Sequence, residues 1–201
     1  MMDHVVLMVP GLGNSDKDHW QSVWESRSPK IKRVQQGNWD EPDLDLWLKS
    51  LSSQIVGIEK PEFIAAHRIG SALVAHWAVR QASTHAVYYS RVFGVLLISS
   101  ADVEAPDRIP PQVRYFAPMV FPSIVLASDD DPYVAEERTR FFAKCWGGRN
   151  PFCWLARPYF YGLWSWRMAA GRENFERIYF SPNGSGLCTW GYRHQVNQNN
   201  V

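Results

Sequence analysis

The feature that most constrains the fold of this chain is an alternation of short apolar runs with segments of helical periodicity over its first 146 residues. Runs that are apolar at nearly every position, such as residues 92–98, predict strands buried on both faces, as in a parallel sheet. The predicted strands are residues 4–9, 31–34, 62–66, 92–98 and 123–126, and the predicted helices are residues 16–27, 42–55, 71–82 and 135–146. The alternation predicts an α/β fold of three layers, with a central, mostly parallel sheet of about five or six strands flanked by helices.

The composition fits one soluble domain and excludes several classes of partner. The chain has 201 residues, of which 46% are hydrophobic and 20% charged, with a formal net charge of +1. A net charge this close to zero argues against a basic surface that would bind nucleic acid or an anionic membrane. The apolar run at the start is short and lacks a basic leader, which predicts a cytoplasmic protein. Cys145, Cys153 and Cys188 form no C-x-x-C pair, so we expect neither a disulfide framework nor a metal site, and no cofactor.

One turn, between the third predicted strand and the third predicted helix, has the sequence Ala66-His67-Arg68-Ile69-Gly70. It resembles the nucleophile elbow of α/β-hydrolases, in which small-x-nucleophile-x-small makes a sharp strand-to-helix turn. That turn lets the helix pack closely while it pushes the central side chain into the cleft. Arg68 lies where this plan requires a serine, and a guanidinium that is always protonated cannot attack an acyl carbon.

The same plan assigns three further residues. The loop Pro10–Gly13 follows the first predicted strand, where the backbone N–H of Leu12 would form one half of an oxyanion hole, and Ile69 would supply the other N–H. Asp131 follows the strand at 123–126, where a triad acid would project from the carboxyl edge of the sheet. The alternative is that the acidic run containing Asp131 is a solvated turn capping the next helix.

These segments together resemble a family of small serine hydrolases typified by retinoblastoma-binding protein nine. The resemblance covers about residues 4–146 and is carried by the stretches VPGLGNSDKDHWQSVWE, WDEPDLDLWL, AHRIGSALVAHWA, LLISSADVEAP, FAPMVFPSIVLAS and DDPY. It implies an α/β-hydrolase fold and esterase-like or amidase-like hydrolysis of a small-molecule ester or amide. It also implies a serine at the elbow, an aspartate in the DDPY segment and a histidine in a late Gly-His-Ile loop.

This chain departs from that pattern at the elbow serine and at the late histidine. Arg68 replaces the serine, and the only histidine after His85 is His194, which lacks the expected neighbours. We therefore expect a degenerate family member with negligible triad hydrolysis. Arg68 would be held at positive φ with its side chain in the cleft, paired with Asp131. The alternatives are a non-catalytic protein that binds a small anion or carboxylate in the old cleft, and a chain that does not fold stably.

The remaining candidate groups have ordinary structural interpretations. His67 is expected to be a packed neighbour of the elbow rather than a base, and His19 and His76 to be surface or boundary residues. Ser71, Ser99 and Ser100 lie near strand ends but not at the elbow tip, so none is expected to replace the nucleophile. The tryptophans up to Trp77 are expected to anchor the core.

The segment 147–201 breaks the pattern of the preceding domain. All three cysteines and five of the ten tryptophans lie from Cys145 onward. Permissible codons for residues 154–180, read from their second base, can spell GSPGHISTASGLGEWPQGEKILNEFI, which resembles the missing family ending. Its tryptophan is forced, because Met168-Ala169 must be encoded ATGGC. We hypothesise a one-base slip between about Gly147 and Cys153, so that residues 147–201 stand in for the last strand and helix. The alternative is a divergent tail.

Overall fold

The computed structural model describes residues 4–58, 62–82, 91–102, 117–119, 121–127, 131–147 and 153–154, and every one of them lies within the unit Met1–Tyr159. Most of the predicted aberrant segment 147–201, with Asp129 and Asp130 of the acidic run before Asp131, lies outside the described residues. In the described part, no helix combines the length and the apolar character that crossing a membrane requires.

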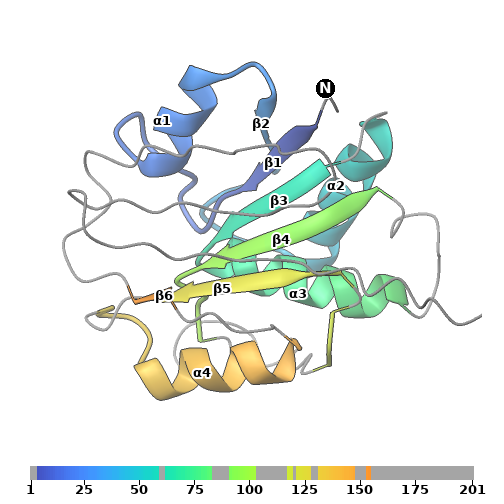
Figure 1. The fold of residues 1–201 in the computed structure, drawn as a ribbon. Coiled ribbons are helices and arrows are strands. Elements are labelled where there is room, and N and C mark those ends of the chain that lie inside the picture. Colours follow the sequence, from blue (N-terminus) through green and yellow to red (C-terminus); the bar gives the residue numbers. More distant parts are fainter. Residues whose placement is uncertain are drawn as a thin grey trace, which may run out of the picture. The chain divides into compact units, whose positions relative to one another are not determined.

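A parallel sheet forms the centre of this unit (Figure 1). Its strands are β1 (Val5–Val9), β2 (Ile31–Arg33), β3 (Glu62–His67), β4 (Val92–Ile98), β5 (Ser123–Ala127) and β6 (Cys153–Trp154), in the order β2-β1-β3-β4-β5-β6. All five neighbouring pairs are parallel, with Val9 opposite Ala66 and His67 opposite Ile98. The predicted α/β fold with a parallel sheet is confirmed.

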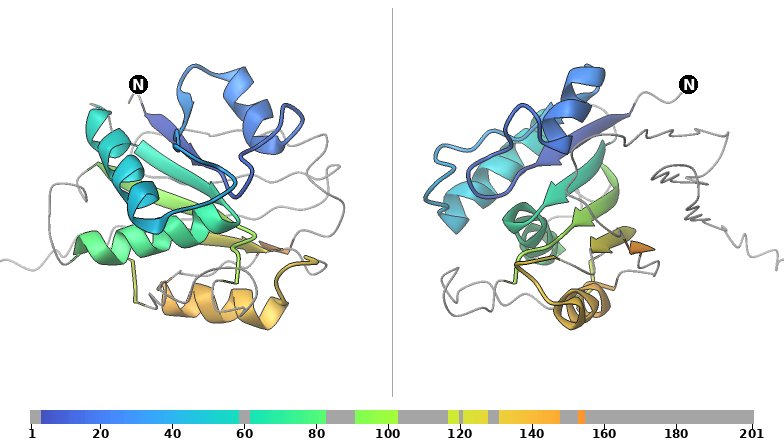
Figure 2. Two further views of the ribbon diagram at one scale, coloured as in Figure 1. Left: turned by 180° about the vertical axis from the view of Figure 1, so that it is seen from behind. Right: turned by 90° about the vertical axis from the view of Figure 1, so that its left-hand side faces the viewer.

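Among the described residues, four helices flank the sheet: α1 (Trp20–Arg27), α2 (Leu44–Gly57), α3 (Ile69–Ala82) and α4 (Glu136–Cys145). Helices α2 and α3 lie together against one face of the sheet, α1 lies beside β2, and α4 lies beside β5 (Figures 1 and 2). Asp43 begins α2 as predicted, because its carboxylate accepts a hydrogen bond from Leu46 N–H at 2.8 Å. In the order of the described elements a helix follows each of β1, β2, β3 and β5, as in consecutive strand-helix units.

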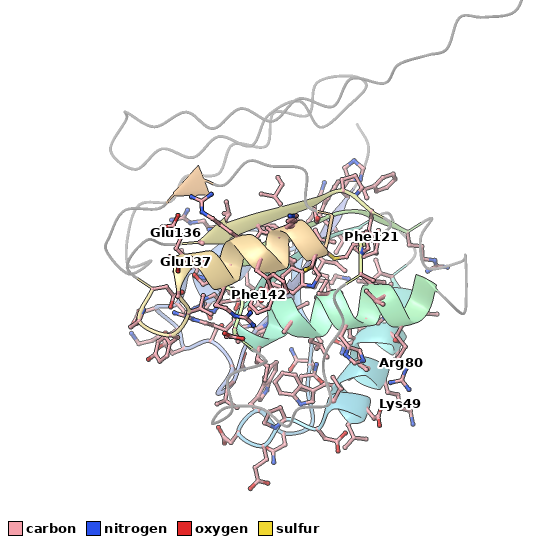
Figure 3. All side chains as sticks on the ribbon, turned by 90° about the horizontal axis from the view of Figure 1, so that it is seen from below. Lys49, Arg80, Phe121, Glu136, Glu137 and Phe142 are labelled. Carbon is pink, nitrogen blue, oxygen red and sulfur yellow. The ribbon has the colours of Figure 1, made fainter. Side chains whose placement is uncertain are left out.

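The core lies between the sheet and these helices. Of the five tryptophans predicted to anchor the core, Trp20, Trp24, Trp47 and Trp77 are buried as predicted, and Trp39 is only partly buried against the core. Trp77 packs on Phe121, with ring centroids 6.1 Å apart, and Phe142 stacks on Trp146 at 5.3 Å. In Figure 3, Phe121 and Phe142 lie near α3 and α4, whereas Lys49, Arg80, Glu136 and Glu137 lie toward the periphery. The aromatic packing fixes the helices that carry the site.

Candidate functional site

The strand-to-helix turn predicted at Arg68 is present. Strand β3 ends at His67, Arg68 adopts φ 54°, and α3 begins at Ile69. Arg68 N–H donates to Ile98 O at 3.1 Å, and Arg68 O accepts from Ser71 N–H at 3.0 Å. A left-handed conformation costs a non-glycine residue about 1 kcal/mol or more, and these bonds to β4 and α3 hold it in place. The predicted positive φ of Arg68 is therefore confirmed.

Small residues on both sides of Arg68 make the turn possible. Ala66 is fully buried before it. A Cβ on Gly70 after it would lie 2.4 Å from the carbonyl oxygens of both Val9 and Pro10, so only glycine lets α3 pack this closely on the end of β1. A Cβ on Gly11 would lie 3.0 Å from Arg68 Cβ. The loop after β1 and the elbow are therefore in contact.

The Arg68 side chain forms an ion pair with Asp131, 63 residues later in the chain. Arg68 Nη1 donates to Oδ1 at 2.7 Å and to Oδ2 at 2.8 Å. The Asp131 side chain is 2% exposed and that of Arg68 is 24% exposed. Asp131 Oδ1 also accepts from Tyr133 N–H at 2.9 Å, and the Tyr133 ring lies 4.6 Å from the guanidinium carbon. The predicted pairing of Arg68 with Asp131 is confirmed.

Several N–H donors around this pair have no acceptor in the described part of the chain. No hydrogen bond there uses the backbone N–H of Leu12 or of Ile69. The ion pair occupies only Nη1 of Arg68, which leaves the N–H groups of Nε and Nη2 unused. Such N–H groups can donate hydrogen bonds to a negatively charged group and stabilise it. The oxyanion-hole role of Leu12 and Ile69 stays a prediction.

No histidine in the described residues contacts Asp131. His67 packs instead on His19, with ring centroids 4.8 Å apart, and on Trp20 at 5.9 Å, as expected of a packed neighbour. Burial, with His19 and Arg68 adding repulsion, lowers the pKa of His67 well below its usual value. Neither imidazole is oriented by Asp131, so the described residues hold no base of the serine-hydrolase kind.

The two remaining described histidines lie away from the elbow. His4 precedes β1 at the amino end of the sheet, where it packs on Phe63 at 5.4 Å. His76 was predicted at the surface or boundary, and this was wrong, because it is only 3% exposed within α3. Burial lowers the pKa of His76 to about 4. Residues 72–79 are apolar at every position except His76, and a helix that is apolar all round is usually buried, so this pattern could have placed His76 inside.

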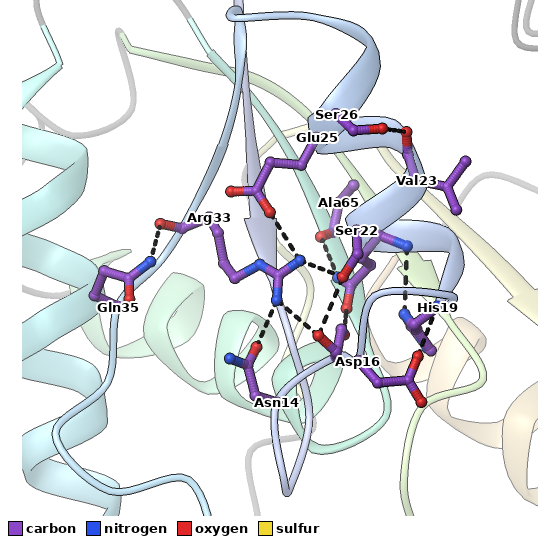
Figure 4. Close-up of polar contacts among 12 residues, drawn as sticks. Asn14, Asp16, His19, Ser22, Val23, Glu25, Ser26, Arg33, Gln35 and Ala65 are labelled. Carbon is purple, nitrogen blue, oxygen red and sulfur yellow. Dashed lines mark hydrogen bonds and ion pairs between the residues drawn. The ribbon is translucent and has the colours of Figure 1, made fainter.

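A largely buried arginine that the sequence did not single out, Arg33, holds the loop that follows β1. Arg33 donates to Asn14 Oδ1 and to Ser15 O, both at 2.9 Å, and to Ser22 Oγ at 2.6 Å (Figure 4). It also forms an ion pair with Glu25 at 2.8 Å. Arg33 thereby ties the loop to α1, and the loop carries Leu12. Its position at the end of β2, next to the sheet edge, gives no sequence pattern that would predict these contacts.

The described residues offer no evident metal site. Among them, no three His, Cys, Asp or Glu residues gather closely enough to hold an ion. The candidate site thus consists of the Arg68–Asp131 ion pair at the turn between β3 and α3, with the loop that carries Leu12 in contact with that turn.

Comparison with known proteins gives the family. The model of the family described as serine hydrolase matches residues 6–154. A structure from Pectobacterium atrosepticum, described as a YdeN-like hydrolase, is 28% identical with a TM-score of 0.63, and the match covers 76% of this chain and 77% of that one. The ydeN gene product of B. subtilis is 17% identical with a TM-score of 0.54, covering 78% and 85%. Est1E of Butyrivibrio proteoclasticus, solved with ferulic acid bound, is 12% identical with a TM-score of 0.53, covering 77% and 79%. No curated protein matches the sequence significantly.

Proposed function

We propose that this chain, which belongs to the serine hydrolase family, does not hydrolyse esters or amides by the family's nucleophilic mechanism. The observation that carries the proposal is Arg68 at the tip of the elbow, bound to Asp131 at 2.7 and 2.8 Å. The reaction needs a group that gives up a proton and attacks an acyl carbon. A guanidinium has no lone pair to offer and keeps its protons at every physiological pH.

The environment of Asp131 supports the same conclusion. In a triad the acid orients a histidine and stabilises the imidazolium that forms during the reaction. Here both carboxylate oxygens of Asp131 accept from Arg68, and the side chain is almost wholly buried. The acid is therefore engaged by the residue that replaced the nucleophile. It acts as a counter-ion, and Arg68 fills the space in which an acyl group would meet a serine.

The original substrate class follows from family membership. We propose that the intact site of an ancestor took a small-molecule ester or amide, with the developing negative charge held by Leu12 N–H and Ile69 N–H. A Cβ built on Gly11 would lie 3.0 Å from Arg68 Cβ and 3.6 Å from Ile69 N, and this closeness of the Leu12 loop to the elbow supports the proposal. This chain would keep the two backbone N–H groups that bind negative charge but would lack the nucleophile.

We further propose that residues 147–201 are an aberrant segment in place of the last strand and helix. The family match ends at residue 154, next to the interval in which the one-base slip would lie. In the shifted frame the Gly-His-Ile loop returns, and with it a histidine for Asp131. The coding DNA tests this directly, because codons that do not permit the shifted string would contradict the slip.

The test of the proposed function compares ester turnover by the chain with that by Arg68→Ala. If the chain is inactive as proposed, both proteins hydrolyse p-nitrophenyl acetate at the same low rate, because neither has a nucleophile. A matched control is Arg140→Ala, which removes an exposed arginine of α4 that pairs with Glu136. Turnover by the chain that Arg68→Ala abolishes and Arg140→Ala leaves intact would overturn the proposal.

A further inference from the structure

We propose that the elbow of this chain binds a small monocarboxylate that carries an apolar group, with the carboxylate on the free edge of Arg68 and the apolar group against Leu12 and Tyr133. The inference builds on the proposed function, because a site without a nucleophile retains its ligand rather than turning it over. It goes further by naming what the site holds.

The guanidinium presents the edge that a carboxylate recognises. Asp131 occupies only Nη1, while Nε and Nη2 have no partner in the described part of the chain. These two nitrogens offer parallel N–H donors in the fork geometry that matches the two oxygens of a carboxylate. The Arg68 side chain is 24% exposed, so a ligand can reach it. The pair with Asp131 holds the guanidinium in one orientation, which reduces the entropy that a ligand must offset.

Two backbone donors reinforce this edge. The Ile69 N–H is at the first turn of α3, a helix of 14 residues, and has no acceptor among the described residues. The Leu12 N–H lies in the loop that touches the elbow and likewise has no described acceptor. Backbone N–H groups at a helix N-terminus favour negative charge. The site therefore combines a fixed cation with N–H donors supplied by two separate segments.

Two exposed apolar side chains indicate that the ligand has more than a charge. Leu12 is 59% exposed and Tyr133 is 57% exposed. Leu12 follows Gly11, and a Cβ built on Gly11 would lie 3.0 Å from Arg68 Cβ. The Tyr133 ring lies 4.6 Å from the guanidinium carbon of Arg68. A bare inorganic anion would leave both side chains in water, whereas an acid with an aryl or alkyl group would cover them. Acyl hydrolysis yields a carboxylic acid, so backbone N–H groups that suit acyl hydrolysis also suit a bound carboxylate.

The test is isothermal titration calorimetry of the full chain with sodium benzoate, with benzamide as its neutral analogue and with sodium phosphate. We expect benzoate to saturate one site per chain while benzamide and phosphate bind at least about tenfold more weakly. Arg68→Gln should weaken benzoate about tenfold or more, and Arg68→Lys should do the same, because an ammonium keeps the charge but lacks the two-donor edge. Leu12→Ala keeps the backbone N–H and should weaken benzoate without affecting acetate.

Circular dichroism confirms that each variant is folded, and Arg140→Gln is the matched control that should leave benzoate affinity unchanged. Benzoate binding that Arg68→Gln does not weaken, no binding to the unaltered chain, or phosphate binding equal to that of benzoate would overturn the proposal. Hydrolysis of phenyl acetate, followed in the same samples, separates the two ideas. Hydrolysis of phenyl acetate that depends on Arg68 would contradict the proposed function. The carboxylate-binding proposal is tested by the benzoate affinities alone.

Discussion

Arg68 and Asp131 form an ion pair at the carboxyl edge of the sheet, with Nη1 2.7 Å from Oδ1 and 2.8 Å from Oδ2. One residue follows β3 and the other follows β5, so the pair spans the strand β4 between them. The ion pair joins the residue at the predicted nucleophile position to the residue predicted as the triad acid, and no histidine among the described residues takes part in it.

The ion pair should be measurable as a coupling energy. Arg68→Met leaves the buried carboxylate of Asp131 without its partner, and we expect a loss of about 1–3 kcal/mol in the free energy of unfolding at pH 7. The double variant Arg68→Met with Asp131→Asn should recover part of that loss. Urea denaturation of both single variants and the double variant gives the coupling. Additive effects would show that the two side chains have no coupling energy, which would contradict the ion pair.

Gly70 should not tolerate a side chain. Gly70→Ala places a methyl group 2.4 Å from the carbonyl oxygens of Val9 and Pro10, so α3 must move away from β1. We expect a loss of about 2–4 kcal/mol in the free energy of unfolding. The control is Gly37→Ala, whose Cβ would meet nothing within 4 Å and whose effect should stay within about 1 kcal/mol. Equal effects of the two substitutions, measured by thermal unfolding, would contradict the close contact.

Stability should fall with acidification because of the buried imidazoles. The pKa of His67 is lowered well below 6.5 in the folded chain and that of His19 to about 4, chiefly by burial. Below pH 6.5 the unfolded chain binds protons that the folded chain does not, so the free energy of unfolding decreases as the pH falls from 6.5 toward 4. His67→Phe removes one such group and should flatten this dependence. Urea denaturation at pH 7, 6, 5 and 4 measures it, and identical slopes for the two proteins would contradict the account.

Arg33 should hold the loop that carries Leu12. Arg33→Met removes donors to Asn14 Oδ1, Ser15 O and Ser22 Oγ. We expect a loss of about 2–4 kcal/mol, together with faster amide hydrogen exchange in the loop between β1 and α1. Lys32→Met on the same strand is the control, because Lys32 is exposed. Unchanged exchange in the loop of Arg33→Met would show that the loop is held by other contacts.

Much of the fold follows from local patterns in the sequence. The strand predicted at residues 92–98 is β4, and the helix predicted from Pro42-Asp43 is α2 with its Asp43 cap. The helix predicted at 16–27 starts later, at Trp20, because Asp16 instead accepts from the N–H groups of Asp18 and His19 in a turn. The two-residue strand β6 was not predicted, because so short a segment has no periodicity of its own.

The sequence predicted those parts of the candidate site whose backbone is set by a local motif, namely the elbow and the strand before Asp131. The elbow sequence predicts a positive φ at Arg68, and the strand that precedes Asp131 predicts its place at the sheet edge. The contacts of Arg33 and the packing of His19 on His67 were missed, because each joins segments that only tertiary packing brings together. The roles of Leu12, Ile69 and Asp131, and the division of the chain at residue 146, stay predictions.

The most direct test of the central claim is covalent labelling by a fluorophosphonate, which reacts with activated serines. Three proteins are compared: the chain itself, Arg68→Ser, and Arg68→Ser with the reading frame restored after Gly147. The account predicts that only the third is labelled at residue 68 and hydrolyses p-nitrophenyl esters, because only it combines a nucleophile with a histidine. Labelling of the unaltered chain at a defined residue, accompanied by ester hydrolysis, would contradict the account and identify a different serine as the nucleophile.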